Sequence, residues 1–120
     1  QGTIPNSLED KLKPRRSSPD TYQLQIIHND GVIKAYSIRQ GNIFRIGTDT
    51  ACTGQIHSPR VQKAEIWIHS KNRTNTLEVI HTSVPVYLND REVTVPQELR
   101  SGDEILIADV RIKYKQTFKE

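Results

Sequence analysis

The feature that most constrains this chain is a series of short apolar runs that alternate with polar residues and end in turn-forming residues. The run Tyr22–His28 alternates in this way, and Asn29-Asp30-Gly31 after it is a typical hairpin turn. The pattern returns at intervals of about 8–12 residues as far as Tyr114. No segment shows the helical period of an amphipathic helix. The sequence therefore predicts an all-β fold.

The number and spacing of these runs favour an antiparallel β-sandwich or barrel of about nine to eleven short strands. Strands are expected at 22–28, 32–39, 43–46, 64–68, 76–80, 86–88, 104–107 and 110–114, with short additions within 48–62 and 91–95. Residues 1–20 hold three prolines and repeat no period, so they are interpreted as a flexible tail or linker. The folded domain is placed at 21–117, and 118–120 are a second tail.

Size, charge and cysteine content exclude several classes of protein. The 120 residues suffice for one domain with a core but not for a large internal catalytic cavity. The formal charge of +3 permits acidic partners but is too small to require nucleic acid. No apolar run approaches the roughly 20 residues needed to cross a bilayer. The single cysteine, Cys52, excludes an internal disulfide and fits an intracellular location, cytoplasmic or nuclear.

No constellation for catalysis or for metal binding is found. Paired carboxylates, a glycine-rich phosphate loop and a nucleophile motif are all missing, so the chain is not expected to be an enzyme or to use a cofactor. The histidines have no ligand spacing, so no metal site is predicted. They are interpreted as solvated or hydrogen-bonded surface residues: His28, His57, His69 and His81.

Four landmarks occur in a characteristic order. A strand ends in Phe44–Gly47, an Ala-x-Ile strand follows at Ala64–Ile68, and the segments Val86–Asn89 and Leu99–Ile107 close the series. This order resembles that of the forkhead-associated (FHA) domain family over about residues 22–115. The resemblance implies an antiparallel β-sandwich of about eleven strands, of the SMAD/FHA type. It also implies a protein partner, which in this family is typically a phosphothreonine peptide.

The resemblance fails at the residues that bind phosphothreonine in this family. A phosphate needs an arginine and several neutral donors to replace its water, and an asparagine in a neighbouring loop holds the peptide backbone. Thr48 stands where the arginine should follow Gly47, and Val84 stands where the asparagine is expected. Each lost hydrogen bond to a charged group costs about 1.5–3 kcal/mol. The phosphate site is therefore predicted to be degenerate.

The second binding loop leaves two alignments open. Without a gap, the family's phosphate-binding serine and structural histidine map onto Arg60 and Lys63, and these two cations could still attract an anion. With a bulge at Pro59, Ser58 takes the serine position instead. The remaining candidates for the phosphopeptide loops are the hydroxyl pair Thr82 and Ser83, and the turn residue Asn89.

Trp67 is a candidate contact residue outside these loops. In Ala64–Ile68 the apolar phase sends Ala64, Ile66 and Ile68 inward, so Glu65 and Trp67 face outward. An outward tryptophan suggests an interface, including that of a homodimer; the alternative is an indole lying flat on neighbouring side chains.

Two functions remain open. One is a protein interaction module that serves as a scaffold or oligomerisation domain of a larger protein. The other is a phosphothreonine reader with substituted site residues, in a signalling, chromatin or secretion-system protein.

Overall fold

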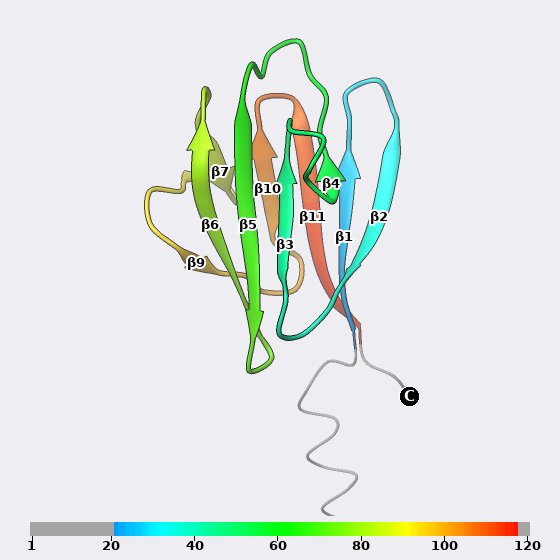
Figure 1. Ribbon diagram of the computed structural model, residues 1–120, viewed down its shortest axis with the longest axis vertical. Helices are drawn as coiled ribbons and strands as arrows, with labels where there is room; N and C mark the ends of the chain where they lie inside the picture. Colours follow the sequence, from blue (N-terminus) through cyan, green and yellow to red (C-terminus); the bar gives the residue numbers. More distant parts are fainter. Residues whose placement is uncertain (1–20, 118–120) are drawn as a thin grey trace, which may run out of the picture.

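The computed structural model describes residues 21–117 of the chain (Figure 1). The predicted tails at 1–20 and 118–120 lie outside the described residues. The described part consists of eleven β-strands joined by turns and loops. The strands are β1 Thr21–Ile27, β2 Ile33–Ile38, β3 Ile43–Gly47, β4 Gly54–Gln55, β5 Ala64–Lys71, β6 Thr74–Thr82, β7 Val86–Leu88, β8 Arg91–Glu92, β9 Gln97–Glu98, β10 Glu104–Ile107 and β11 Val110–Thr117.

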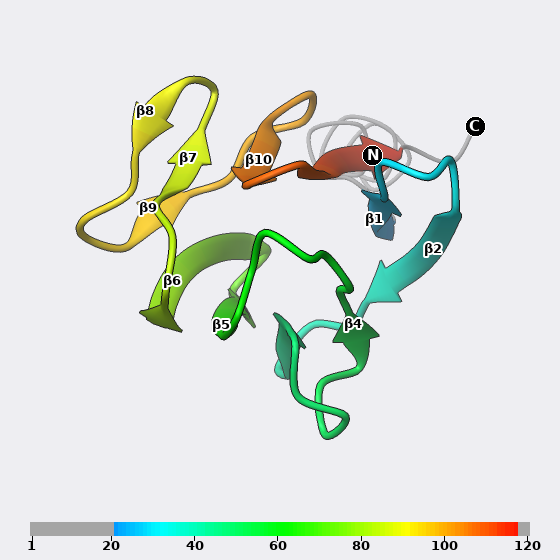
Figure 2. The ribbon, with the colours of Figure 1, turned by 90° about the horizontal axis from the view of Figure 1, so that it is seen from above.

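The strands form two sheets that pack face to face, and the predicted antiparallel β-sandwich is confirmed (Figures 1 and 2). The six-stranded sheet has the order β2-β1-β11-β10-β7-β8, and the five-stranded sheet has the order β4-β3-β5-β6-β9. All pairs are antiparallel except β3 and β4, which are parallel over two residues. The described residues contain no helix that could cross a membrane.

The core lies between the sheets and follows from the alternation of each strand. In β1 the buried residues are Tyr22, Leu24 and Ile26, and β11 contributes Ile112 and Tyr114 beside them. Because successive side chains in a strand point to opposite faces, every second residue enters the core. The first and last described strands, β1 and β11, are paired neighbours in the same sheet, with Thr21 opposite Thr117.

One hairpin is tighter than the sequence indicates. Six polar residues at 70–75 predict a long turn, whereas β5 and β6 pair as far as Lys71 and Thr74. The turn itself is Asn72-Arg73, and both residues have positive φ angles, 54° and 63°. A two-residue type I′ turn requires this conformation, because it matches the twist of the strands. Asparagine adopts this left-handed conformation readily, but arginine rarely does, so the sequence does not predict the turn.

The binding-loop candidates of the sequence lie mainly at one end of the sandwich. This loop end consists of the connections β3–β4 (48–53), β4–β5 (56–63), β6–β7 (83–85) and β10–β11 (108–109), toward the top of Figure 1, where the β1–β2 turn (28–32) also lies. The first and last described residues lie at the opposite end (Figure 1). A rigid sandwich thus presents several loops together, an arrangement typical of binding sites.

Candidate interaction site

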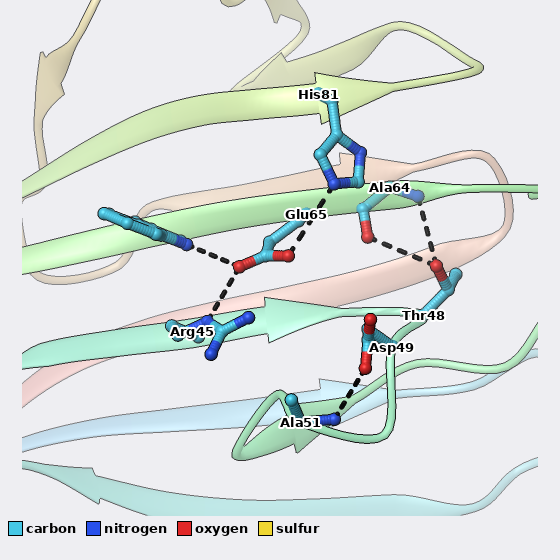
Figure 3. Close-up of polar contacts among 8 residues, drawn as sticks. Arg45, Thr48, Asp49, Ala51, Ala64, Glu65 and His81 are labelled. Carbon is cyan, nitrogen blue, oxygen red and sulfur yellow. Dashed lines mark hydrogen bonds and ion pairs between the residues drawn. The ribbon is translucent and has the colours of Figure 1, made fainter.

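Thr48 begins the β3–β4 loop and is turned toward the neighbouring strand. Its Oγ1 accepts a hydrogen bond from the Ala64 N–H at 3.2 Å (Figure 3), and its own N–H donates to the Ala64 carbonyl at 2.9 Å. The half-buried side chain therefore joins the ends of β3 and β5. Thr48, which the sequence analysis predicts to stand in place of the family's arginine, thus uses its hydroxyl within the fold.

Ser58 in the β4–β5 loop contacts the β10–β11 turn. Its Oγ donates a hydrogen bond to Asp109 Oδ1 at 2.6 Å and accepts one from the Arg60 N–H at 3.1 Å. The short distance to a carboxylate is typical of a charge-assisted hydrogen bond. The hydroxyl is thus held by a negatively charged group, which disfavours a phosphate at the same position.

The hydroxyl groups of the β6–β7 loop also form hydrogen bonds within the fold. The Lys63 N–H donates to Ser83 Oγ at 3.1 Å, and the Ser83 N–H donates to the Lys63 carbonyl at 2.7 Å. Thr82 Oγ1 accepts from the Val84 N–H at 3.2 Å and donates to the Val84 carbonyl. Val84 packs partly buried against the core, so this loop offers no amide side chain to a peptide.

Cationic side chains still face solvent at the loop end. Arg60 and Lys63 are exposed, and neither forms an ion pair with any residue of 21–117. Lys63 also borders an open hollow with Gln62, His81, Thr82 and Ser83. The loop end therefore combines the cations Arg60 and Lys63 with the carboxylates of Asp49 and Asp109, and its formal charges cancel.

Asn89 lies apart from the other loop candidates. The first residue of β7, Val86, lies beside the loop end, because it pairs with Ile107 at the end of β10. Asn89 follows the last residue of β7 and therefore lies farther from the loop end. The Asn89 side chain donates to Asp103 Oδ1 at 2.8 Å and accepts from the Glu104 N–H at 2.9 Å. With a φ angle of 50°, Asn89 shapes a turn and joins it to the start of β10.

Trp67 lies on the outer face of the five-stranded sheet, while Ala64, Ile66 and Ile68 are buried in the core. The indole is half-buried, and its Nε1 donates to Glu65 Oε2 at 2.6 Å. Its ring lies 5.8 Å from that of His69. Neighbouring side chains thus shield part of the indole, and its role as a protein contact stays a prediction.

Glu65 is the centre of a polar cluster that the sequence did not reveal. Although it lies on the outer face, it is only 7% exposed, because Arg45, Trp67 and His81 cover it (Figure 3). Arg45 Nε donates to Glu65 Oε2 at 2.8 Å, and His81 Nε2 lies 3.7 Å from Oε1. The hydrogen bonds from Arg45 and then from Trp67 hold the pKa of the Glu65 carboxyl below its ordinary value of 4.5, although burial acts in the opposite direction.

A β-bulge brings His81 to this cluster. The register shifts so that Glu65 pairs with His81 while Ile66 pairs with Val79, and Ile80 is the extra residue. Without the bulge, Ile80 would stand opposite Glu65. A bulge of this kind re-aims side chains on one strand without breaking the sheet, and nothing in the local composition predicts it.

The depressed pKa of Glu65 makes stability depend on pH. The carboxylate stabilises the fold above the unfolded pKa near 4.5, and this contribution is lost as the pH falls through the lower folded value. We expect the free energy of unfolding of wild type to decrease between about pH 6 and pH 3, and to decrease less for Glu65→Gln. Urea unfolding followed by circular dichroism measures both curves.

The control for this experiment is Glu104→Gln. Glu104 lies 3.8 Å from Arg111 in an exposed ion pair, which contributes little to stability. Its variant should therefore follow the wild-type pH curve. Equal slopes for the wild type and Glu65→Gln would show that the cluster does not stabilise the carboxylate.

His28 is buried, and the prediction that it lies at the surface is wrong: its exposed fraction is only 6%. It lies at the end of β1, where its Nε2 accepts a hydrogen bond from the His57 N–H at 3.2 Å and so connects β1 to the β4–β5 loop. Among residues 21–117, no group of three or more His, Cys, Asp or Glu side chains is placed to hold a metal ion.

Comparison with known families decides the identity of the fold. The model of the FHA domain matches residues 44–108, which is more than half of the chain. The chain belongs to the FHA domain family. FHA domains typically act as protein interaction modules that bind phosphopeptides, and they are generally not enzymes. Among curated proteins, none matches this sequence significantly.

Solved FHA domains have the same fold at low sequence identity. The FHA domain of a hypothetical protein of Arabidopsis thaliana superposes with a TM-score of 0.72 at 16% identity, covering 86% of this chain and 90% of that one. The FHA domain of CT664 from Chlamydia trachomatis superposes with a TM-score of 0.69 at 11% identity, covering 81% of this chain and 98% of that one. The yeast Dun1 FHA domain was solved with a doubly phosphorylated peptide. It superposes with a TM-score of 0.59 at 18% identity, covering 86% of this chain and 79% of that one.

Proposed function

We propose that this FHA domain is a protein–protein interaction module, a scaffold or oligomerisation domain of a larger protein, whose loop end is not a phosphothreonine site of ordinary strength. The observation that carries the proposal is the use of the loop hydroxyls within the fold. The four hydroxyl groups belong to Thr48, Ser58, Thr82 and Ser83. A ligand would have to compete with these internal hydrogen bonds.

Charge supports the same conclusion. The family's arginine is replaced by Thr48, and Asp109 lies in contact with Ser58 at 2.6 Å. A phosphate bound at Ser58 would meet a like charge, and like charges at such distances repel strongly unless one is neutralised. The backbone clamp is missing as well, because Val84 has no amide side chain.

One observation favours the second function, a phosphothreonine reader with a rearranged site. Arg60 and Lys63 are exposed and unpaired within the described part of the chain, so they could meet a phosphate from solvent. Exposed lysine and arginine contacts are strongly screened by salt. A reader of this kind would therefore bind weakly and lose affinity as salt is added.

We expect phosphothreonine peptides to bind the wild-type domain with a Kd weaker than about 100 µM. Isothermal titration calorimetry with a phosphothreonine peptide library, repeated over a salt series, measures this. The dephosphorylated peptides are the matched control. Micromolar or tighter binding that disappears on dephosphorylation would contradict the proposal and identify the domain as a phosphothreonine reader.

A further inference from the structure

Strand β2 is an edge strand with little protection against pairing. It pairs with β1 on one side, and no described strand pairs with its other side, which lies at the outer limit of the six-stranded sheet (Figure 2). Natural sheets protect such edges with charges, prolines, bulges or very short strands. β2 has six residues, only one of them charged (Lys34), no proline, and a register with β1 that does not shift. Ile33 is 57% exposed, and Val32 before it is 46% exposed.

The free hydrogen-bonding groups of this edge can be assigned from the hairpin. Just before β2, the His28 N–H donates to the Val32 carbonyl at 2.9 Å, so these residues form a hydrogen-bonded pair. In an antiparallel ladder such pairs alternate with non-hydrogen-bonded ones. The even-numbered residues of β2 therefore bond to β1, with Tyr36 opposite Leu24. The N–H and C=O groups of Ile33, Ala35 and Ser37 point away from β1.

We propose that β2 pairs antiparallel with β2 of a second copy of this chain, about a twofold axis at Ala35. In this register Ala35 faces Ala35 of the second copy, and Ile33 faces Ser37. All three residues with free groups then form hydrogen-bonded pairs, and each pair exchanges two hydrogen bonds. Two six-stranded sheets would join into one continuous sheet with no free β2 edge.

Side chains agree with this register. Lys34 lies opposite Tyr36 of the second copy, so no like charges face each other within the paired strands. Arg39, directly after β2, comes opposite Gly31 in the β1–β2 turn of the second copy, so Arg39 of one copy and Asp30 of the other bring opposite charges to each end of the paired strands. Opposite charges across strands stabilise a pair, and like charges destabilise it.

Neighbouring registers are less favourable. A shift by two residues in one direction places Lys34 directly opposite Lys34 of the second copy. A shift in the other direction places Ile33 opposite Arg39, beyond the end of β2 at Ile38. The occupant that best fits this edge is therefore a second copy centred on Ala35. This dimer gives the proposed oligomerisation role a specific surface, distinct from the loop end.

The test uses opposite charges at the twofold axis. Sedimentation equilibrium of the full chain over a wide concentration range should show a dimer. Ala35→Lys and Ala35→Glu should each weaken association about fivefold or more, because like charges then face each other at the axis. An equimolar mixture of the two variants should regain wild-type association or exceed it. Gln97→Lys, which adds the same charge to the exposed β9 edge, should leave the dimer unchanged.

Several outcomes would overturn the proposal. These are a wild-type monomer at all concentrations, a dimer unaffected by both Ala35 variants, or two weakened variants whose mixture does not recover. Circular dichroism confirms that each variant is folded. Ala35→Pro is a second probe, since it removes an N–H that points away from β1, and it should also weaken association. Failure here removes the β2 surface from the proposed oligomerisation role but leaves the phosphopeptide result untouched, because calorimetry tests phosphopeptide binding separately.

Discussion

Replacing Thr48 with arginine and Val84 with asparagine in the same chain is expected to raise affinity for phosphothreonine peptides at least about 100-fold. The two changes restore the cation and the amide that the family uses. A hydrogen bond to the charged phosphate contributes about 1.5–3 kcal/mol, each bond of the asparagine amide to the neutral peptide backbone contributes about 0.5–1.5 kcal/mol, and 1.4 kcal/mol corresponds to tenfold in affinity. Calorimetry with the same peptides as for wild type measures the gain.

The fold should tolerate both changes at a modest cost. Thr48→Arg removes the hydroxyl that accepts from the Ala64 N–H at 3.2 Å, but the backbone bond from Thr48 to the Ala64 carbonyl remains. Val84→Asn removes a partly buried apolar side chain at the margin of the core. We expect each change to destabilise the domain by about 1 kcal/mol, so it should remain folded.

The control places the same charge elsewhere in the same loop. Thr53 is exposed, and Thr53→Arg with Val84→Asn adds an arginine that is not positioned beside Gly47. This pair should gain little affinity for the peptide. An equal gain in the control, or an equal gain toward the unphosphorylated peptide, would show that general charge attraction and not a restored site is responsible.

The strands could be predicted from the sequence because their signal is local. The limits of β7 and β10 agree with the prediction, since each is an apolar run bounded by turn residues. β9 lies in a segment where no strand was predicted, and β4 is two residues long. Such short strands depend on a neighbouring strand for their hydrogen bonds, and alternation over two residues carries no information.

The candidate site was predicted only in part, because its partners are distant in sequence. The sequence predicts that Thr48 takes the place of the family's arginine, but the contact between Ser58 and Asp109 joins residues 51 positions apart. Alternation correctly places Glu65 on the outer face, yet its burial depends on Arg45, Trp67 and His81 from three strands. Contacts of this kind are decided by register and bulges, which no local pattern reveals.

Packing explains why a glycine stands at position 47, in agreement with the family motif. Its carbonyl accepts from the Ile56 N–H at 2.8 Å, and the Thr48 N–H beside it donates to the Ala64 carbonyl at 2.9 Å. The end of β3 is thus held closely between β4 and β5. A Cβ at this position would collide with the Ala64 carbonyl oxygen and would lie 3.0 Å from Glu65 Cα. The glycine is required by packing, whereas the resemblance assigns the family's arginine to phosphate binding.

Gly47→Ala is therefore expected to destabilise the domain by about 3 kcal/mol or more, because the atoms in the way belong to backbone that cannot rotate aside. For a domain of this size the melting temperature should fall by more than about 10 °C. Differential scanning calorimetry measures this, with Gly31→Asn as the control. Gly31 has open space around its Cα and a φ angle of 92°, and asparagine tolerates the left-handed region, so the control should stay within about 1 kcal/mol of wild type. A Gly47→Ala domain as stable as the control would mean that β3 can move away from β5, and that the glycine persists for a reason other than packing.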